Sequence, residues 1–131
     1  MIWILIGTND YARGCSKESI LAGNLAVLKE VMDRKPDTPI VINSILPVGP
    51  SPLIGDEPNA RWEAYQWINA RLECLASSNQ NLFFFNGTSY FLTEDGRQIN
   101  QALMDDFLHP SKEGSLLWGS AIVETLHELL G

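Results

Sequence analysis

The sequence predicts an α/β fold with a parallel sheet and helices on both of its faces. Three short apolar segments alternate with three longer segments whose apolar residues recur at helical spacing. Alternation of this kind is typical of a parallel sheet with right-handed crossovers. The strands are expected at residues 2–6, 39–45 and 82–85, and the helices at residues 16–34, 59–76 and 111–130.

The composition is that of one globular domain spanning residues 1–131, with 45% hydrophobic residues. Nine Lys and Arg against sixteen Asp and Glu give a formal net charge of −7 with no basic stripe, which disfavours nucleic acids and anionic membranes as partners. Cys15 and Cys74 lie too far apart for a disulfide framework or a thiolate metal site, and we expect inert or buried thiols. The apolar run at residues 1–6 is too short for a signal peptide or a membrane span, so the cytoplasm is the default localisation.

The expected helices and strands differ in how their apolar residues are spaced. Residues 2–6 are apolar without polar alternation, which is typical of a strand in the interior of a sheet, covered on both faces. Ser16 and Ser111 can cap the first and last helices, and each helix is expected to turn one apolar face inward. The inward residues are Ile20, Leu21, Leu25, Leu28, Val31 and Met32 in the first helix, Trp62, Tyr65, Ile68, Leu72 and Leu75 in the second, and Leu116, Ile122, Val123, Leu126 and Leu130 in the last.

The remaining connections are expected to be irregular. Residues 46–58 hold four prolines and two glycines, a density that predicts a long surface loop. Asn86 and Gly87 predict a turn after the third strand. Residues 88–110 form a longer connection, in which one short helical piece is expected around residues 98–104.

Polar residues follow the first strand at the place where a site is expected. In an open α/β sheet the functional loops leave the carboxyl ends of the strands, which is where Asn9 and Asp10 lie. An Asn there can donate a side-chain N–H to a developing oxyanion, and an Asp can brace the loop by accepting backbone N–H groups. The alternative is that Thr8, Asn9 and Asp10 form only a turn that leads into a helix.

Asp106 and His109 lie three residues apart just before the last helix. His109 can act as a general base while the Asp106 carboxylate fixes its tautomer and supports its charged form. One alternative is a surface histidine with an acid nearby by chance. Another is a metal site built from Asp105, Asp106 and His109, although no further ligand is apparent in the sequence.

Three blocks taken together resemble those of the SGNH, or GDSL-like, hydrolase family. They are residues 6–10 after the first strand, residues 45–47 after the second, and residues 106–111 before the last helix. The resemblance spans the entire chain and is closest to esterases similar to platelet-activating-factor acetylhydrolase subunits. It implies a flavodoxin-like three-layer parallel sheet, incomplete here with about three strands, and ester hydrolysis through a serine acyl-enzyme without a cofactor or a metal.

The resemblance also implies roles for individual residues. Asn9 matches the oxyanion-hole Asn of the family, with Gly7 and Asp10 in its supporting loop, while His109 matches the catalytic base and Asp106 the third member of the triad. The family's Gly-Asp-Ser block, which carries the nucleophile, has no match in this chain. We therefore expect this chain to be the carboxyl-terminal part of the fold and to be inactive alone, because it lacks the nucleophile.

Two hypotheses about function follow. In the first, the chain is part of a serine esterase that hydrolyses small acyl or acetyl esters. In the second, it is a non-catalytic α/β module of the same fold that binds a ligand in its cleft or a partner at its sheet edge. The family's strand order places the strand at residues 1–6 in the centre, whereas here it has one neighbour. Its open edge could therefore pair with a second copy or with a missing amino-terminal segment.

Overall fold

The computed structural model describes residues 1–49 and 58–131 and confirms the predicted alternation of strands and helices. Most of the predicted loop at residues 46–58 lies outside the described residues, and the part up to Gly49 has no regular structure. In chain order the elements are β1 (Ile2–Ile4), α1 (Thr8–Ala12), α2 (Lys17–Arg34), β2 (Ile40–Asn43), α3 (Pro58–Ser77), β3 (Leu82–Phe85), the 3₁₀ helix η1 (Gly87–Phe91) and α4 (Lys112–Leu130).

The three strands form one parallel sheet in the order β1-β2-β3. The register pairs Ile40 of β2 with Ile2 on one side and Leu82 on the other. All four residues of β2 are buried, because β2 has a neighbour on each side. Every residue of β1 is only half-buried, so the expected interior position is wrong for β1 in this chain. Within the described residues β1 pairs with β2 alone, which confirms the open edge.

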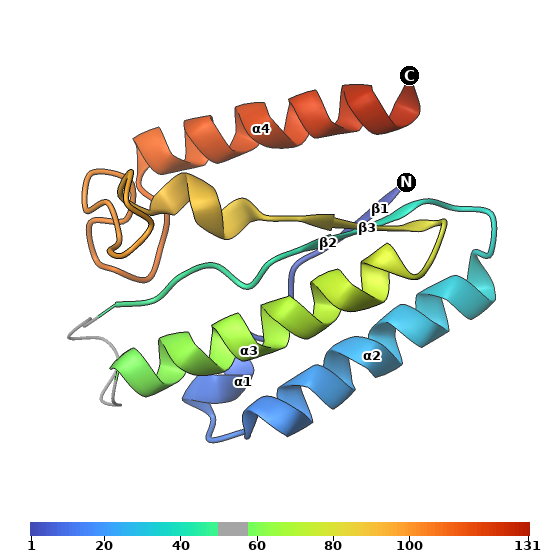
Figure 1. The fold of residues 1–131 in the computed structure, drawn as a ribbon, viewed down its shortest axis with the longest axis horizontal. Helices are drawn as coiled ribbons and strands as arrows, with labels where there is room; N and C mark the ends of the chain where they lie inside the picture. The colour runs from blue at the N-terminus through green and yellow to red at the C-terminus, as the bar shows by residue number, and fades with distance from the viewer. Residues whose placement is uncertain (50–57) are drawn as a thin grey trace.

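Helices cover both faces of the sheet, as predicted (Figure 1). Figure 1 shows α4 on one side of the strands and α2 with α3 on the other. Successive residues of β2 point to opposite faces, so Ile42 joins the core cluster beneath α2 and α3, whereas Val41 joins the cluster beneath α4. The cluster between the sheet and α2 and α3 includes Leu28, Ile68 and Leu72, which are at most 1% exposed. The structure is therefore a three-layer α/β sandwich with a partial sheet.

Asn43 at the end of β2 links β1 to α4. Its side-chain oxygen accepts the indole N–H of Trp3, at 3.3 Å, and of Trp118, at 3.1 Å. Its amide nitrogen donates to the Ser44 carbonyl at 2.8 Å. Asn43 is 2% exposed, and these bonds satisfy a polar group that would be costly to bury alone.

Several residues predicted to face inward are exposed instead. The exposed fractions are 64% for Leu116, 50% for Val123, 64% for Leu130 and 40% for Leu25. The α4 helix is apolar on two sides, and the side that carries Trp118, Ala121 and Ile122 faces the sheet. Spacing alone cannot choose between two apolar sides of one helix, which explains the error. In α2, the buried line is Ile20, Asn24 and Leu28, and Asn24 is buried because its amide donates to the Ile20 carbonyl at 2.9 Å.

The connections also differ from the prediction in places. The turn expected at Asn86 and Gly87 is the start of η1, and no helix forms at residues 98–104. There, Leu92 and Ile99 form an antiparallel bridge, and the Thr93 amide donates to the Gln98 carbonyl at 2.8 Å. This local pairing uses the backbone groups that a helix would need.

Cys15 and Cys74 are free cysteines, and both are exposed, so of the two alternatives, inert or buried thiols, burial is wrong. Both lie in or beside helices whose buried faces are formed by larger apolar residues. None of the helices within residues 1–49 and 58–131 combines the length and hydropathy needed to cross a bilayer.

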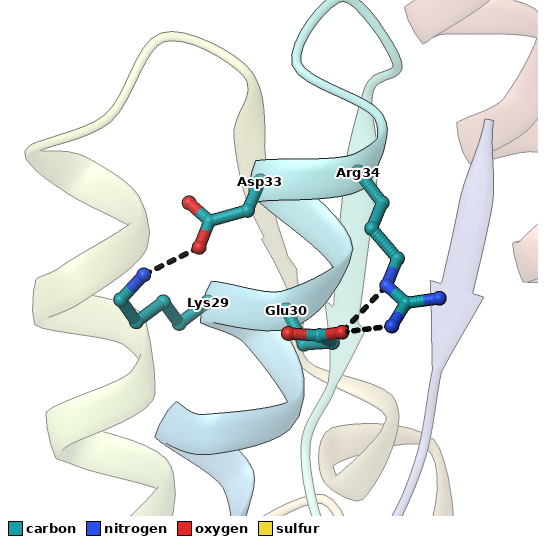
Figure 2. A network of polar contacts seen from close by, with 4 residues as sticks. All are labelled: Lys29, Glu30, Asp33 and Arg34. Carbon is teal, nitrogen blue, oxygen red and sulfur yellow. Dashed lines mark hydrogen bonds and ion pairs between the residues drawn. The ribbon is translucent and has the colours of Figure 1, made fainter.

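The ends and the outer surface of the helices are stabilised locally. Ser16 caps α2 by accepting the Ser19 amide at 3.2 Å, and Ser111 caps α4 by accepting the Gly114 amide at 3.1 Å, as predicted. Figure 2 shows two ion pairs on α2, Lys29 with Asp33 and Glu30 with Arg34, each between residues one helical turn apart. All four side chains are more than half exposed, so each pair contributes no more than roughly 0.5 kcal/mol to stability.

We expect Gly114→Ala to destabilise the fold by about 1–3 kcal/mol, because overpacking at a buried site has a cost of this size. A Cβ at Gly114 would lie 2.2 Å from the Leu103 carbonyl oxygen, a backbone atom that cannot rotate away. The matched control in the same helix is Gly119→Ala, where a Cβ meets nothing within 4 Å. There the better helix propensity of Ala should stabilise by up to about 1 kcal/mol. Urea unfolding measures both variants, and an equal effect of the two would contradict the close packing of α4 on residues 102–103.

Candidate active site

The candidate residues lie at the edge of the sheet where the parallel strands end. Figure 1 shows α1 and the irregular connection after η1 at the same end of the molecule, away from the two termini. The Gly49 amide, beyond the end of β2, donates to the Phe107 carbonyl at 2.9 Å. This bond fixes the loop of Asp106 and His109 at the edge from which β1 leads into Asn9.

Gly7 shapes the turn between β1 and Asn9. Its φ of 117° lies in the left-handed region that favours glycine. A Cβ at Gly7 would also lie 2.9 Å from Ile45 Cδ1 and 3.0 Å from Ile20 Cγ2, so a side chain would be strained and crowded. The helix α1 starts immediately afterwards at Thr8, so residues 8–10 do lead into a helix, and Asn9 is exposed in its first turn.

Asp10 contributes to this turn through its backbone. Its carbonyl accepts the amides of Arg13, at 3.1 Å, and Cys15, at 3.0 Å, which closes the end of α1. The residue is exposed and lines a shallow hollow of about 220 Å³ beside Ile6 and Val27. The structure therefore places Asp10 in the turn that closes α1, where its backbone carbonyl, and not the side chain expected from the sequence, accepts these bonds.

Arg61 and Tyr65 of α3 also reach this turn, and the sequence analysis missed both as site residues. Arg61 Nη2 and Tyr65 Oη donate to the Thr8 carbonyl at 3.0 Å and 2.9 Å. A usable signal was present in the sequence. Arg61 lies four positions before Tyr65 on the apolar face that continues to Ile68, and a cation on a buried face requires polar partners.

Asp106 and His109 form the pair that the sequence predicted. Asp106 Oδ2 lies 2.6 Å from His109 Nδ1, a short distance that fits a charge-assisted hydrogen bond to a carboxylate. The other oxygen, Oδ1, accepts the backbone N–H of Leu108 at 2.8 Å and of His109 at 2.6 Å. The His109 side chain is 68% exposed, so its ring is open to a reactant while the carboxylate holds Nδ1.

The hydrogen bonds around Asp106 favour its charged form. The backbone N–H of His109 is the main cause that lowers the pKa of Asp106, from 3.8 to about 2. Partial burial opposes this shift, and the His109 side chain and the Leu108 amide add to it. The carboxylate is therefore ionised at neutral pH and can stabilise a positive charge that develops on the imidazole.

The loop that carries the pair has an unusual backbone. Phe107 has a φ of 59°, which is uncommon for a residue with a side chain and costs on the order of 1 kcal/mol or more. The hydrogen bond from Gly49 and the close approach of the Phe107 ring to Gly49 hold this conformation. The loop then enters α4, where Ser111 donates its amide to the Leu103 carbonyl at 2.8 Å.

A cavity of about 310 Å³ lies against the same loop. Its walls are mostly apolar and include Val48, Trp62, Ile99 and Phe107, while Arg97 and Gln98 add polar groups. Such a mixture suits the apolar part of a small molecule. The metal alternative at Asp105, Asp106 and His109 has no support, because no group of three or more potential ligands gathers within residues 1–49 and 58–131.

This partial parallel sheet, with its His–Asp pair, has known counterparts. Residues 1–117 match the model of the GDSL-like lipase/acylhydrolase family, and the chain belongs to that family. It is 27% identical over 130 residues to the platelet-activating factor acetylhydrolase IB subunit alpha1 of Pongo abelii, and 26% identical to that of Homo sapiens. Each alignment covers 99% of this chain and 50% of the relative, so the chain spans about half the length of these curated relatives.

Solved structures agree with this assignment. A Streptococcus pneumonia protein described as a platelet activating factor is 26% identical, with a TM-score of 0.79 over 95% of this chain and 58% of that one. A GDSL-like lipase from Bacteroides thetaiotaomicron is 23% identical, with a TM-score of 0.81 over 98% of this chain and 62% of that one, which shows the fold. The predicted α/β fold and the resemblance to the SGNH, or GDSL-like, hydrolases are confirmed.

We expect the Asp106 carboxyl to titrate with a pKa of about 2. Because this value lies below the ordinary one, the pairing stabilises the fold above the ordinary carboxyl pKa and is lost as the pH falls through about 2. Carbon NMR of the side-chain carboxyl measures the titration. In His109→Ala the pKa of Asp106 should rise only part of the way toward 3.8, since the backbone N–H groups of residues 108 and 109 still donate to its carboxylate. An ordinary pKa in the unmodified protein would contradict the observed hydrogen bonding.

Proposed function

We propose that this chain, as one domain, carries the base and part of the oxyanion hole of a serine ester hydrolase that acts on small acyl or acetyl esters. His109 is the general base, Asp106 its orienting carboxylate, and Asn9 an oxyanion donor supported by Gly7 and Asp10. The distance of 2.6 Å between Asp106 Oδ2 and His109 Nδ1, with the ring otherwise exposed, is the observation that carries this proposal.

The reaction follows from these positions. Asp106 holds the proton on His109 Nδ1, which leaves Nε2 free to accept a proton from the nucleophile. A serine hydroxyl attacks the ester carbonyl, its proton passes to Nε2, and Asn9 donates to the oxyanion. The alcohol leaves with the proton from Nε2. Water then attacks the acyl-enzyme through the same base, the acid is released, and the serine recovers its proton.

The serine must come from outside this sequence, because no Gly-Asp-Ser block occurs in residues 1–131. We propose that the chain corresponds to the carboxyl-terminal part of the fold and that it is inactive alone. The ratio of lengths supports this proposal, since the chain covers half of the curated relatives. The DNA immediately upstream of the Met1 codon is the first place to search for an in-frame Gly-Asp-Ser block.

We expect the purified chain to hydrolyse p-nitrophenyl acetate no faster than His109→Ala, which controls for slow cleavage by an exposed imidazole. Co-expression with a polypeptide that carries the Gly-Asp-Ser block should produce burst kinetics, because an acyl-enzyme accumulates. In that complex, His109→Ala and Asp106→Asn should each lower kcat by a factor on the order of 10⁴ or more.

Two results would contradict this proposal. One is fast turnover by the chain alone that disappears when one of its own serines is replaced. The other is an active complex whose kcat does not change in His109→Ala.

The second candidate function, a binding or interaction module, is favoured by a different observation. The outer edge of β1 has no partner among the described residues. Ile6, which follows β1 and is 37% exposed, and Val27 of α2, which is 41% exposed, line one hollow and add apolar surface to this part of the chain. An unpaired apolar edge is a template for another strand. We propose that, in this alternative, the edge pairs with a second copy of the chain.

We expect the isolated chain to self-associate at micromolar concentration, as measured by light scattering. Ile6→Lys and Val27→Lys should reduce the scattering, because a charge opposes the docking of an apolar partner and both side chains are exposed in the monomer. The matched control is Gln66→Lys, which adds the same charge at an exposed position of α3. A strictly monomeric chain, or an equal effect of Gln66→Lys, would contradict pairing at this edge.

A further inference from the structure

The strongest unexplained feature of the molecule is the buried cation of α3. Arg61 is 1% exposed, and burial of a guanidinium is costly unless polar groups surround it. Its Nε donates to Tyr65 Oη at 2.9 Å, and its Nη2 donates to the Thr8 carbonyl at 3.0 Å. Both of these contacts lead to the residue that precedes Asn9.

Tyr65, Arg61 and the Thr8 carbonyl are joined to one another by three hydrogen bonds. Its hydroxyl accepts from Arg61, so its own proton is directed to the Thr8 carbonyl, at 2.9 Å. Tyr65 is fully buried, and three groups joined in this way strengthen one another at low local dielectric. Thr8 is 53 positions from Arg61 and 57 from Tyr65, so these bonds tie α3 directly to the turn after β1.

A second contact fixes α1 one turn further along. The Tyr11 ring lies edge-on to the Tyr65 ring at 6.0 Å, and the Arg61 guanidinium lies over the Tyr11 ring at 5.5 Å. Thr8 and Tyr11 are three positions apart and therefore lie on one side of α1. Arg61 and Tyr65 thus hold α1 at two points on the side that faces α3.

We propose that Arg61 and Tyr65 are positioning residues that orient Asn9 through the Thr8 carbonyl. The peptide group between Thr8 and Asn9 is planar, so two donors on its oxygen fix the plane from which the Asn9 backbone continues. Gly7 fixes the chain on the other side of Thr8 through its left-handed conformation. With the backbone before Asn9 fixed, only the dihedral angles of Asn9 itself remain free to rotate. An oxyanion donor needs this kind of preorganisation.

This inference rests on the proposed function of Asn9, and its test separates the two. In the complemented enzyme, Tyr65→Phe removes one hydroxyl and keeps the ring against Tyr11. We expect kcat to fall about tenfold with KM unchanged, because a misplaced oxyanion donor weakens the transition state more than the bound ester. Arg61→Lys, which keeps the charge but not the planar fork, should retain more activity than Arg61→Met and less than the unmodified protein.

The matched control is Thr88→Val. Thr88 Oγ1 donates to the Ile45 carbonyl at 3.0 Å, so this variant also removes one buried hydroxyl from a loop carbonyl, but after β2. Both variants should lower Tm by a similar amount, and only Tyr65→Phe should lower kcat. Equal values of kcat in the two variants would overturn the positioning role, whatever their Tm.

If the complex has no esterase activity, the proposed function is wrong, but the positioning role of Arg61 and Tyr65 can still be tested on the chain alone. The NMR signals of the Asn9 side-chain amide report its surroundings directly. They should shift in Tyr65→Phe and stay in place in Thr88→Val. Unchanged Asn9 signals in Tyr65→Phe would overturn the inference.

Discussion

The pairing of β2 with a parallel strand on each side is the constraint on which the rest of the structure depends. It brings the carboxyl ends of β1, β2 and β3 to one edge and leaves β2 with no exposed residue. The turn beyond β2 is anchored to α3 and to η1. Asn69 of α3 accepts the Ile45 amide at 2.8 Å and donates to its carbonyl at 2.9 Å, while Ser44 and Thr88 share a buried hydrogen bond of 2.9 Å. The candidate residues lie at the same edge of the sheet.

The order of the three strands and of α2, α3 and α4 could be predicted from the sequence because each has its own periodicity, whereas the short helices α1 and η1 were not predicted. The boundaries agree closely for α2, β2, β3 and α4. The inward face of α4 could not be predicted, since Val123 and Ile122 are equally apolar neighbours and only the position of the sheet decides which is buried. The helix expected at residues 98–104 failed for a related reason, because the pairing of Leu92 with Ile99 lies outside any local helical pattern.

Within the candidate site, too, local contacts could be predicted from the sequence and contacts between distant parts of the chain could not. Asp106 and His109 are three residues apart, so a short motif contains most of their geometry. Arg61 and Tyr65 act on a carbonyl more than fifty positions away, and no local pattern shows which backbone atom they reach. Asn9 and Gly7 lie between these cases. The block after the first strand pointed to them, but the left-handed conformation of Gly7 and the crowding by Ile45 depend on the assembled core.

Asn43 has a consequence for the order of folding. Its side-chain oxygen joins Trp3 at the start of the chain to Trp118, which is 75 positions further along than Asn43 itself. Contacts of such long range require closure of large loops, which is entropically expensive and slow. We therefore expect α4, which closes the larger of the two loops onto Asn43, to dock after β1 has paired with β2. Since the loop of Asp106 and His109 leads directly into α4, we expect the candidate site to become ordered late in folding, together with that helix.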